Sequence, residues 1–175
     1  MIDARVLPVL TVESADHAET TCRALLADGY GTVEITFRTA AAADAIRRVR
    51  EIDGLTVGAG TVLSEEQLEA ALEAGAQFAV APSTNPVVID AAQRAGIPFI
   101  PGAATPTEID RARSFGCDVI KIFPASAVGG PAFIRAVSAV FPDVKFIPTG
   151  GINAGNVDEY LALPSVLACG GSWLA

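Results

Sequence analysis

A lysine inside an apolar run is the first feature of this chain that could do chemistry. Residues 118–125 read DVIKIFPA, and Lys121 is one of only two lysines in the sequence. Burial disfavours the charged ammonium and so favours the neutral, nucleophilic amine. Such an amine condenses with a ketone to give a Schiff base, whose iminium stabilises an adjacent carbanion as an enamine. The alternative is a lysine that extends to the rim or forms only a structural ion pair.

The segment 32–38, TVEITFR, supplies an acid and a second cation. Glu34 and Arg38 share one parity with two threonines, whereas the residues of opposite parity are all apolar. Side chains alternate along a strand, so the apolar face should pack on helices and the polar face should point inward. Glu34 is then a candidate general acid and base, and Arg38, near the mouth, offers a planar fork to a carboxylate or phosphate. For both residues a purely structural role as a counter-ion stays open. For the segment itself, an edge strand of an antiparallel sheet with one solvent-exposed face also stays open.

The elements that must position these groups recur about every twenty residues. Eight short runs rich in Val, Ile or Phe predict strands: residues 6–12, 32–38, 55–62, 77–83, 98–103, 118–124, 145–151 and 166–172. Alanine-rich amphipathic segments lie between them. Helices are predicted over 14–29, with Ser14 as cap, over 64–75, with Ser64 as cap, and over 105–116, where Pro106 suits a first turn.

Alternating strands and helices predict parallel strands joined by right-handed crossovers. Eight strands favour a closed (β/α)8 TIM barrel, an α/β fold, as a single domain over residues 1–175. The sequence stops shortly after the eighth strand, so the barrel is expected to lack its final helix, either because the chain is truncated or because that segment is disordered.

Two predicted strands end in paired glycines, PTGG at 148–151 and CGGS at 169–172. Glycines let backbone N–H groups approach an anion without a Cβ in the way. The loops after strands seven and eight of such barrels frequently form a phosphate site. The end GAGT at 58–61 adds Thr61, whose hydroxyl could meet a ligand, although tight packing also explains these small residues. Schiff-base chemistry on a phosphorylated keto compound follows from these residues together.

Composition removes several other classes. A net charge of -8 with no basic run makes nucleic acid an unexpected partner. No apolar stretch approaches the roughly 20 residues that span a bilayer, and no signal peptide is predicted, so we expect a cytoplasmic protein away from membranes. Three widely spaced cysteines indicate buried thiols in a reducing compartment. One histidine and no Cys/His cluster argue against zinc, although a carboxylate-bound magnesium stays open.

The motifs together resemble the class I 2-keto-3-deoxy-6-phosphogluconate (KDPG) aldolases. VEITFRT, VGAGTV, GAQFAVAPS, IPFIPGAATPTEI, KIFPAS with a following GG, FIPTGGI and GGSWL occur in the family's order and spacing over residues 6–174. The resemblance implies reversible cleavage of KDPG to pyruvate and glyceraldehyde 3-phosphate without metal or cofactor. It further implies a cytosolic bacterial homotrimer that serves the Entner–Doudoroff pathway and also accepts 4-hydroxy-2-oxoglutarate.

The resemblance assigns roles by motif. Lys121 would be the Schiff-base lysine and Glu34 the proton shuttle. The substrate-binding residues would be Arg38 and Thr61 at the pyruvyl carboxylate, Pro82 and Phe123 in the pocket wall, Thr149 against the substrate, and Gly150, Gly151, Gly171 and Ser172 at the distal phosphate.

The sequence departs from the family in four places. Ile122 stands where many members have Phe, but its parity is opposite to that of Lys121, so it should face the helices. Ser83 follows Pro82 where a glycine is common. A helix before the first strand is absent, as is the last one. Relatives acting on the galactonate derivative tend to lack the PTGGI end of this chain, which favours the gluconate substrate.

Three alternatives stay open at the level of sequence. One is 2-dehydro-3-deoxy-6-phosphogalactonate aldolase. Another is a phosphate-binding barrel isomerase or epimerase in which Lys121 only stabilises an enolate. The third is a barrel that binds its ligand without catalysis.

Overall fold

Strands and helices alternate along residues 5–174, which the computed structural model describes. The strands are β1 (Val6–Leu10), β2 (Thr32–Thr36), β3 (Thr56–Gly60), β4 (Phe78–Val80), β5 (Phe99–Ile100), β6 (Gly102–Ala103), β7 (Val119–Ile122), β8 (Lys145–Pro148) and β9 (Cys169–Gly171). The helices are α1 (Ala15–Ala27), α2 (Ala42–Val49), α3 (Glu65–Glu73), α4 (Pro86–Ala95), α5 (Pro106–Ser114), α6 (Gly130–Val140) and α7 (Val157–Leu161). The predicted order is therefore confirmed.

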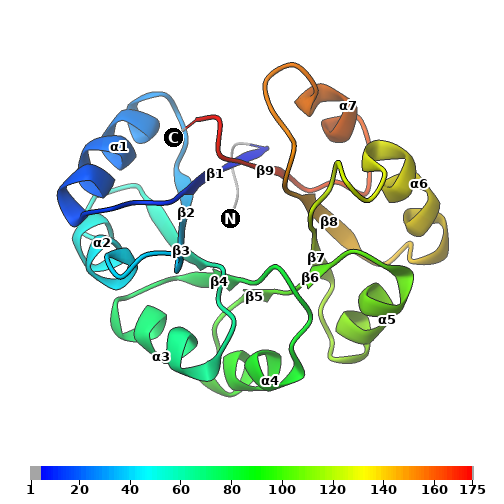
Figure 1. Ribbon diagram of the computed structural model, residues 1–175, viewed down its shortest axis with the longest axis horizontal. Helices are drawn as coiled ribbons and strands as arrows, with labels where there is room; N and C mark the ends of the chain where they lie inside the picture. The colour runs from blue at the N-terminus through cyan, green and yellow to red at the C-terminus, as the bar shows by residue number, and fades with distance from the viewer. Residues whose placement is uncertain (1–4, 175) are drawn as a thin grey trace.

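The strands form a ring with the helices outside it (Figure 1). One run of parallel strands has the order β5-β4-β3-β2-β1-β9, and a second has the order β6-β7-β8. Parallel bridges from Phe146 to Val166 and from Thr149 to Gly170 join β8 to the last strand segment. β5 and β6 follow each other directly in the chain. The structure is thus an α/β barrel of the TIM type, as predicted.

Proline divides the fifth predicted strand. Residues 98–103 were expected to form one strand, but β5 pairs with β4 and β6 pairs with β7, with Pro101 between them. Proline has no N–H to donate to a ladder, which accounts for a break at this residue. Its carbonyl still accepts a hydrogen bond of 2.8 Å from the backbone N–H of Lys121, so the ring continues past the break.

β2 is a central strand, so the antiparallel edge interpretation is wrong. It pairs in parallel with β1 on one side and with β3 on the other. Val33 and Ile35 are fully buried in a cluster that includes residues of α1, α2 and α3. The apolar parity of β2 therefore faces the helices, and the parity of Glu34 faces the interior of the barrel, as predicted.

The predicted helix starts are confirmed by their caps. Ser14 accepts a hydrogen bond from the backbone N–H of His17, and Ser64 accepts one from that of Gln67. Pro106 occupies the first turn of α5. Within residues 5–174 no helix follows β9, and the outer ring is open between α7 and α1 (Figure 1).

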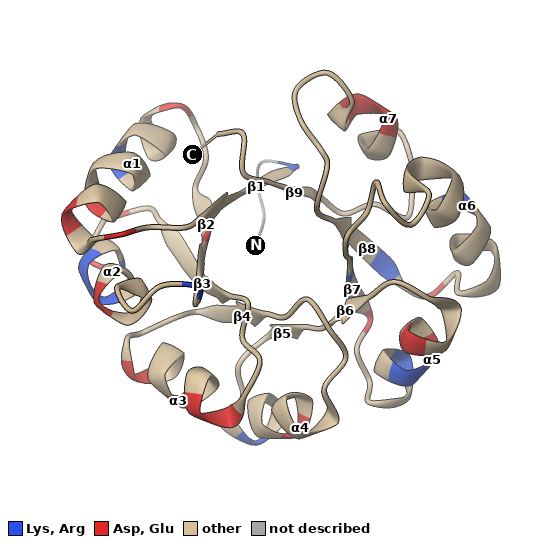
Figure 2. Ribbon diagram, in the orientation of Figure 1, with Lys and Arg blue, Asp and Glu red and all other residues tan. Residues whose placement is uncertain are grey.

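Charged residues lie mostly on the outer helices (Figure 2). None of the helices within residues 5–174 combines the length and the apolar character needed to cross a membrane. Figure 2 also shows how few charged residues the strands carry, and Glu34 and Lys121 are both buried there. These two residues are therefore the unusual ones that the fold must explain.

Candidate active site

Glu34 and Lys121 meet inside the barrel. Lys121 Nζ donates to Glu34 Oε1 across 3.3 Å, although the residues are 87 positions apart in sequence. Glu34 is 1% exposed and Lys121 4% exposed. Their strands, β2 and β7, lie on different sides of the ring (Figure 1). The contact depends on the inward parity of both side chains. It joins an amine and a carboxylate that can exchange a proton away from bulk water.

Aromatic and small residues surround the amine. The Phe123 ring centroid is 5.8 Å from Lys121 Nζ, and the same ring lies 3.3 Å from the position that a Cβ on Gly150 would take. Gly102 is the register partner of Lys121 and packs closely on the backbone of Pro82. Phe123 therefore lies beside the amine, which supports its predicted place in the pocket wall. Pro82 follows β4, and Gly102 separates it from Lys121. Its role in the wall of the same pocket stays a prediction.

Ile122 faces away from this interior. It is fully buried in the outer cluster with Ile120 and Phe146, between the strands and the helices. The expectation that Ile122 faces the helices is thus confirmed. Position 122 therefore lies on the face of β7 opposite to that of Lys121.

Thr61 follows β3 in a strained conformation. It has a φ of 58°, and it is the one non-glycine residue with positive φ among the residues that the structure describes. A β-branched residue in the left-handed region costs of the order of 1–2 kcal/mol. Such strain marks candidate functional positions. It directly follows Gly60, which contacts Glu34, so Thr61 lies at the mouth nearest the acid.

Arg38 lies outside the strand that was expected to position it. β2 ends at Thr36, and the next residues turn, so strand alternation does not determine where Arg38 points. The side chain is exposed. The predicted strand limit at Arg38 is therefore wrong, although its place just past the carboxyl end of β2 is that of a residue at the barrel mouth.

Thr149 carries a polar atom without a partner. Its residue is 9% exposed, and its Oγ1 is buried with no hydrogen-bond partner within the described part of the chain. An unpaired buried hydroxyl costs about 1–3 kcal/mol. An orphaned atom next to a candidate site indicates that a ligand completes it. This observation supports the predicted contact between Thr149 and a substrate.

The paired glycines have the geometry of an anion loop only in part. Gly150 and Gly151 both have positive φ, 99° and 74°, a backbone conformation that glycine adopts without steric cost. Gly171 is buried in β9 as the register partner of Pro8. Ser172 is exposed and lines a groove of about 410 Å³ shared with residues of β1 and α1.

The cysteines do not compete with Lys121 as nucleophiles. Burial raises the pKa of the Cys22 thiol to about 11 and that of Cys169 to about 12. Burial, followed by the charge of Asp118, also raises the pKa of Cys117. A thiol needs its thiolate form to attack a carbon. The predicted burial of the cysteines is confirmed for Cys22 and Cys169, whereas Cys117 is half-buried.

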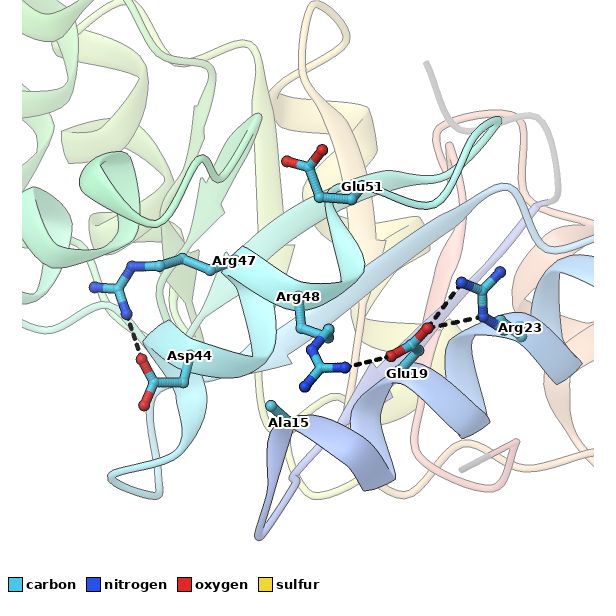
Figure 3. Close-up of a pocket in the computed structure, with 7 residues that line it drawn as sticks. All are labelled: Ala15, Glu19, Arg23, Asp44, Arg47, Arg48 and Glu51. Carbon is cyan, nitrogen blue, oxygen red and sulfur yellow. Dashed lines mark hydrogen bonds and ion pairs between the residues drawn. The ribbon is translucent and has the colours of Figure 1, made fainter.

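Two other hollows hold none of the predicted site residues. A groove between α1 and α2 is lined by charged side chains that pair with each other, such as Glu19 with both Arg23 and Arg48 (Figure 3). A cavity of about 540 Å³ lies at the amino ends of the strands, with Phe78, Phe99 and Leu167 among its lining residues. The Glu34–Lys121 pair therefore remains the chemical centre.

Two glycines that touch the site, Gly60 and Gly102, are not assigned to it by the sequence. Like Gly170 of the CGGS motif, each lies close to a predicted site residue of another strand. The signal was present, since the segment 58–61 was noted as small and compatible with tight packing. Nothing in the sequence shows which side chain such a glycine accommodates, because that depends on the stagger of neighbouring strands.

Known proteins match this chain over nearly its whole length. The family model described as "Aldolase: KDPG and KHG aldolase" matches residues 1–175. The "2-dehydro-3-deoxy-phosphogluconate aldolase" of Treponema pallidum (strain Nichols) is 48% identical over 97% of this chain and 81% of that protein. The "KHG/KDPG aldolase" of Escherichia coli (strain K12) is 45% identical over 97% of this chain and 80% of that protein.

A solved structure gives the same result in three dimensions. The KDPG aldolase from Legionella pneumophila "with pyruvate captured at low pH as a covalent carbinolamine intermediate" superimposes with a TM-score of 0.93. It is 40% identical, and the match covers 97% of this chain and 83% of that one. This relative therefore resembles the chain both in fold and in amino-acid sequence.

Proposed function

The chain belongs to the KDPG and KHG aldolase family, and on that premise we propose that Lys121 and Glu34 carry out its reaction, with the other residues assigned above binding the substrate. The enzyme is a lyase that cleaves 2-dehydro-3-deoxy-6-phosphogluconate to pyruvate and glyceraldehyde 3-phosphate. One observation carries the assignment of residues: a buried amine lies 3.3 Å from a buried carboxylate.

Formation of the Schiff base uses both groups. The Lys121 ammonium first gives a proton to Glu34 Oε1, and the neutral amine attacks C2 of the keto acid. The protonated Glu34 then gives its proton to the hydroxyl group of the resulting carbinolamine. The protonated hydroxyl leaves as water. The product is an iminium joined to Lys121, and Glu34 is again a carboxylate.

Carbon–carbon cleavage then follows from the iminium. Glu34, directly or through a water molecule, removes the proton of the C4 hydroxyl. The electron pair of the C3–C4 bond moves into the iminium, which releases glyceraldehyde 3-phosphate and leaves an enamine. Protonation of the enamine at C3 by Glu34 and hydrolysis of the iminium give pyruvate and restore the free lysine. Each proton taken by Glu34 is thus returned within one turnover.

Two anionic ends fix the substrate in this proposal. Arg38 and Thr61, at the carboxyl ends of β2 and β3, bind the pyruvyl carboxylate, for which a guanidinium fork is suited. The distal phosphate accepts hydrogen bonds from backbone N–H groups of the two glycine-rich loops and from the hydroxyl of Ser172. The four residues proposed there are Gly150, Gly151, Gly171 and Ser172. Thr149, which is proposed to contact the substrate beside them, gains a partner for its orphaned hydroxyl.

We further propose three properties from the family resemblance. The enzyme acts as a cytoplasmic homotrimer, and it also cleaves 4-hydroxy-2-oxoglutarate to pyruvate and glyoxylate, as the family's description suggests. Light scattering would give a mass of three chains, whereas a monomer would contradict the trimer. Pyruvate release from 4-hydroxy-2-oxoglutarate tests the second substrate.

The two lysines of the chain give a matched test of the mechanism. Lys121→Ala should abolish pyruvate release from KDPG in a coupled assay while the barrel still folds. Lys145→Ala removes the exposed lysine at the start of β8 and should leave the rate unchanged. Glu34→Gln should slow proton exchange at the methyl group of pyruvate strongly. Full cleavage by Lys121→Ala would contradict the proposal.

A further inference from the structure

Four glycines of the ring occupy a common position relative to the candidate site. Each glycine lies on, or directly after, the strand next to the one that carries the site residue. Because the glycine has no side chain, the site residue can occupy the space beside it. A Cβ added to the glycine would meet Glu34 at Gly60 (2.1 Å), Pro82 at Gly102 (2.2 Å), Phe123 at Gly150 (3.3 Å) and Thr149 at Gly170 (2.3 Å).

The contact at Gly60 involves the reactive atom itself. A Cβ there would lie 2.1 Å from Glu34 Oε1 and 2.6 Å from both Cδ and Cγ. Oε1 is the same oxygen that accepts from Lys121 Nζ. Glu34 is in register with Gly58, so its side chain runs along the strands toward their carboxyl ends to reach Gly60. The carboxylate is therefore held between the glycine of β3 and the amine of β7.

We propose that Gly60 is a positioning residue for catalysis: the absence of a side chain at this position allows the Glu34 carboxylate to contact Lys121. The inference rests on the proposed role of Glu34 as acid and base, and it adds the reason why β3 must present a glycine there. Gly170 is in the same relation to Thr149, whose Oγ1 would meet a Cβ at 2.3 Å.

A methyl group at position 60 would displace the Glu34 carboxylate and leave the backbone of the barrel in place. All three atoms it meets belong to the far end of the Glu34 side chain. Oε1 would have to move by about 1 Å to reach even 3.0 Å, the shortest separation that Cβ atoms normally show. A misplacement of about 1 Å in a catalytic group can cost about 100-fold in rate. At Gly102 the obstructing atoms are backbone, so a substitution there would strain the chain instead.

Gly58 offers a matched control on the same strand. A Cβ at Gly58 would meet the Phe78 ring at 2.2 Å, as close a contact as the one at Gly60. Phe78 belongs to the small cluster inside the barrel with Leu7 and Val80. Gly58→Ala and Gly60→Ala therefore add the same methyl group to the same strand, and only the second one touches the carboxylate.

The experiment compares Gly60→Ala, Gly58→Ala, Glu34→Asp and the double variant Glu34→Asp/Gly60→Ala. The readouts are KDPG cleavage, deuterium exchange at the pyruvate methyl group, and thermal unfolding. We expect Gly60→Ala to lose about 100-fold in exchange rate, and Gly58→Ala to stay within about threefold while its Tm falls. Aspartate is one methylene shorter, so Gly60→Ala should cost less than about tenfold in the Glu34→Asp background.

Each outcome decides the proposal. A normal exchange rate in Gly60→Ala overturns it, and so does an equal loss from Gly60→Ala in both backgrounds. If Gly60→Ala alone does not fold, folding of the double variant supports the proposal, and failure of both variants to fold overturns it. Full activity of Glu34→Gln would refute the proposed function instead, so the two failures are distinguishable.

Discussion

Removing the charge of Glu34 should cost stability as well as activity, because Lys121 then loses its buried partner. Two unit charges 3.3 Å apart attract each other by about 5 kcal/mol at an effective dielectric constant of about 20. Part of this energy offsets the desolvation of both groups. Breaking a buried pair from one side typically costs about 3–5 kcal/mol, because the remaining charge stays uncompensated. We therefore expect Glu34→Gln to lose about 3–5 kcal/mol of unfolding free energy at neutral pH.

A double-mutant cycle separates this pair energy from simple loss of packing. Glu34→Gln and Lys121→Met each leave one charge alone, whereas the double variant leaves two neutral side chains of similar size. Urea unfolding of the four proteins should show a double variant more stable than the sum of the single losses predicts, by at least about 2 kcal/mol. Additive losses within about 0.5 kcal/mol would show that the two side chains do not interact and would refute the geometry of the site.

Three further predictions concern other residues of the barrel. Thr149→Val removes the orphaned hydroxyl, so the substrate-free protein should gain about 1 kcal/mol of unfolding free energy while KM for KDPG rises; unchanged values of both would contradict the assigned contact. Arg38→Lys keeps the charge but loses the fork, so KM for KDPG should rise at least about tenfold, and an unaltered KM would remove Arg38 from the site. Hydrogen bonds, first from the backbone N–H of Ala104 and then from Thr105, lower the pKa of Glu108. Glu108→Ala should therefore lower the unfolding free energy by about 1 kcal/mol at pH 7. This difference between the variant and the wild type should disappear as the pH falls through the lowered pKa, because wild-type Glu108 is then itself protonated. A difference that persists at pH 2 would contradict this assignment.

The central pair could be predicted from sequence because strand alternation is a strong constraint. A strand with one apolar face must turn that face to the helices, which leaves Glu34 pointing inward on β2. Alternation also predicts that Ile122 faces away from Lys121, whereas the inward place of Lys121 is favoured because Glu34 is available as its partner. Both placements are confirmed, because each residue lies within a strand, where the period of two applies.

The reasoning failed where a strand ended earlier than its apolar pattern. Arg38 lies two residues past the end of β2, so parity no longer determines its direction. Pro101 likewise divides a run that looked continuous. Both errors concern element boundaries, which depend on hydrogen bonds to neighbouring strands more than on local composition.

The role of the glycines could not be predicted for a different reason. A paired glycine in a loop suggests an anion site, as at residues 150–151 and 170–171. The close approach of Gly60 to Glu34 depends instead on how far β3 is staggered relative to β2. Stagger is a property of the closed ring and not of any single segment.

Trapping of the Schiff base tests the central claim most directly. Incubation with pyruvate and sodium borohydride should add about 72 Da irreversibly to the protein, the mass of a reduced pyruvate adduct on one amine. Peptide mapping should place the adduct on Lys121, and neither Lys121→Ala nor protein treated with borohydride alone should gain this mass. A wild-type enzyme that releases pyruvate from KDPG but gains no mass, or that carries the adduct on Lys145, would contradict the account.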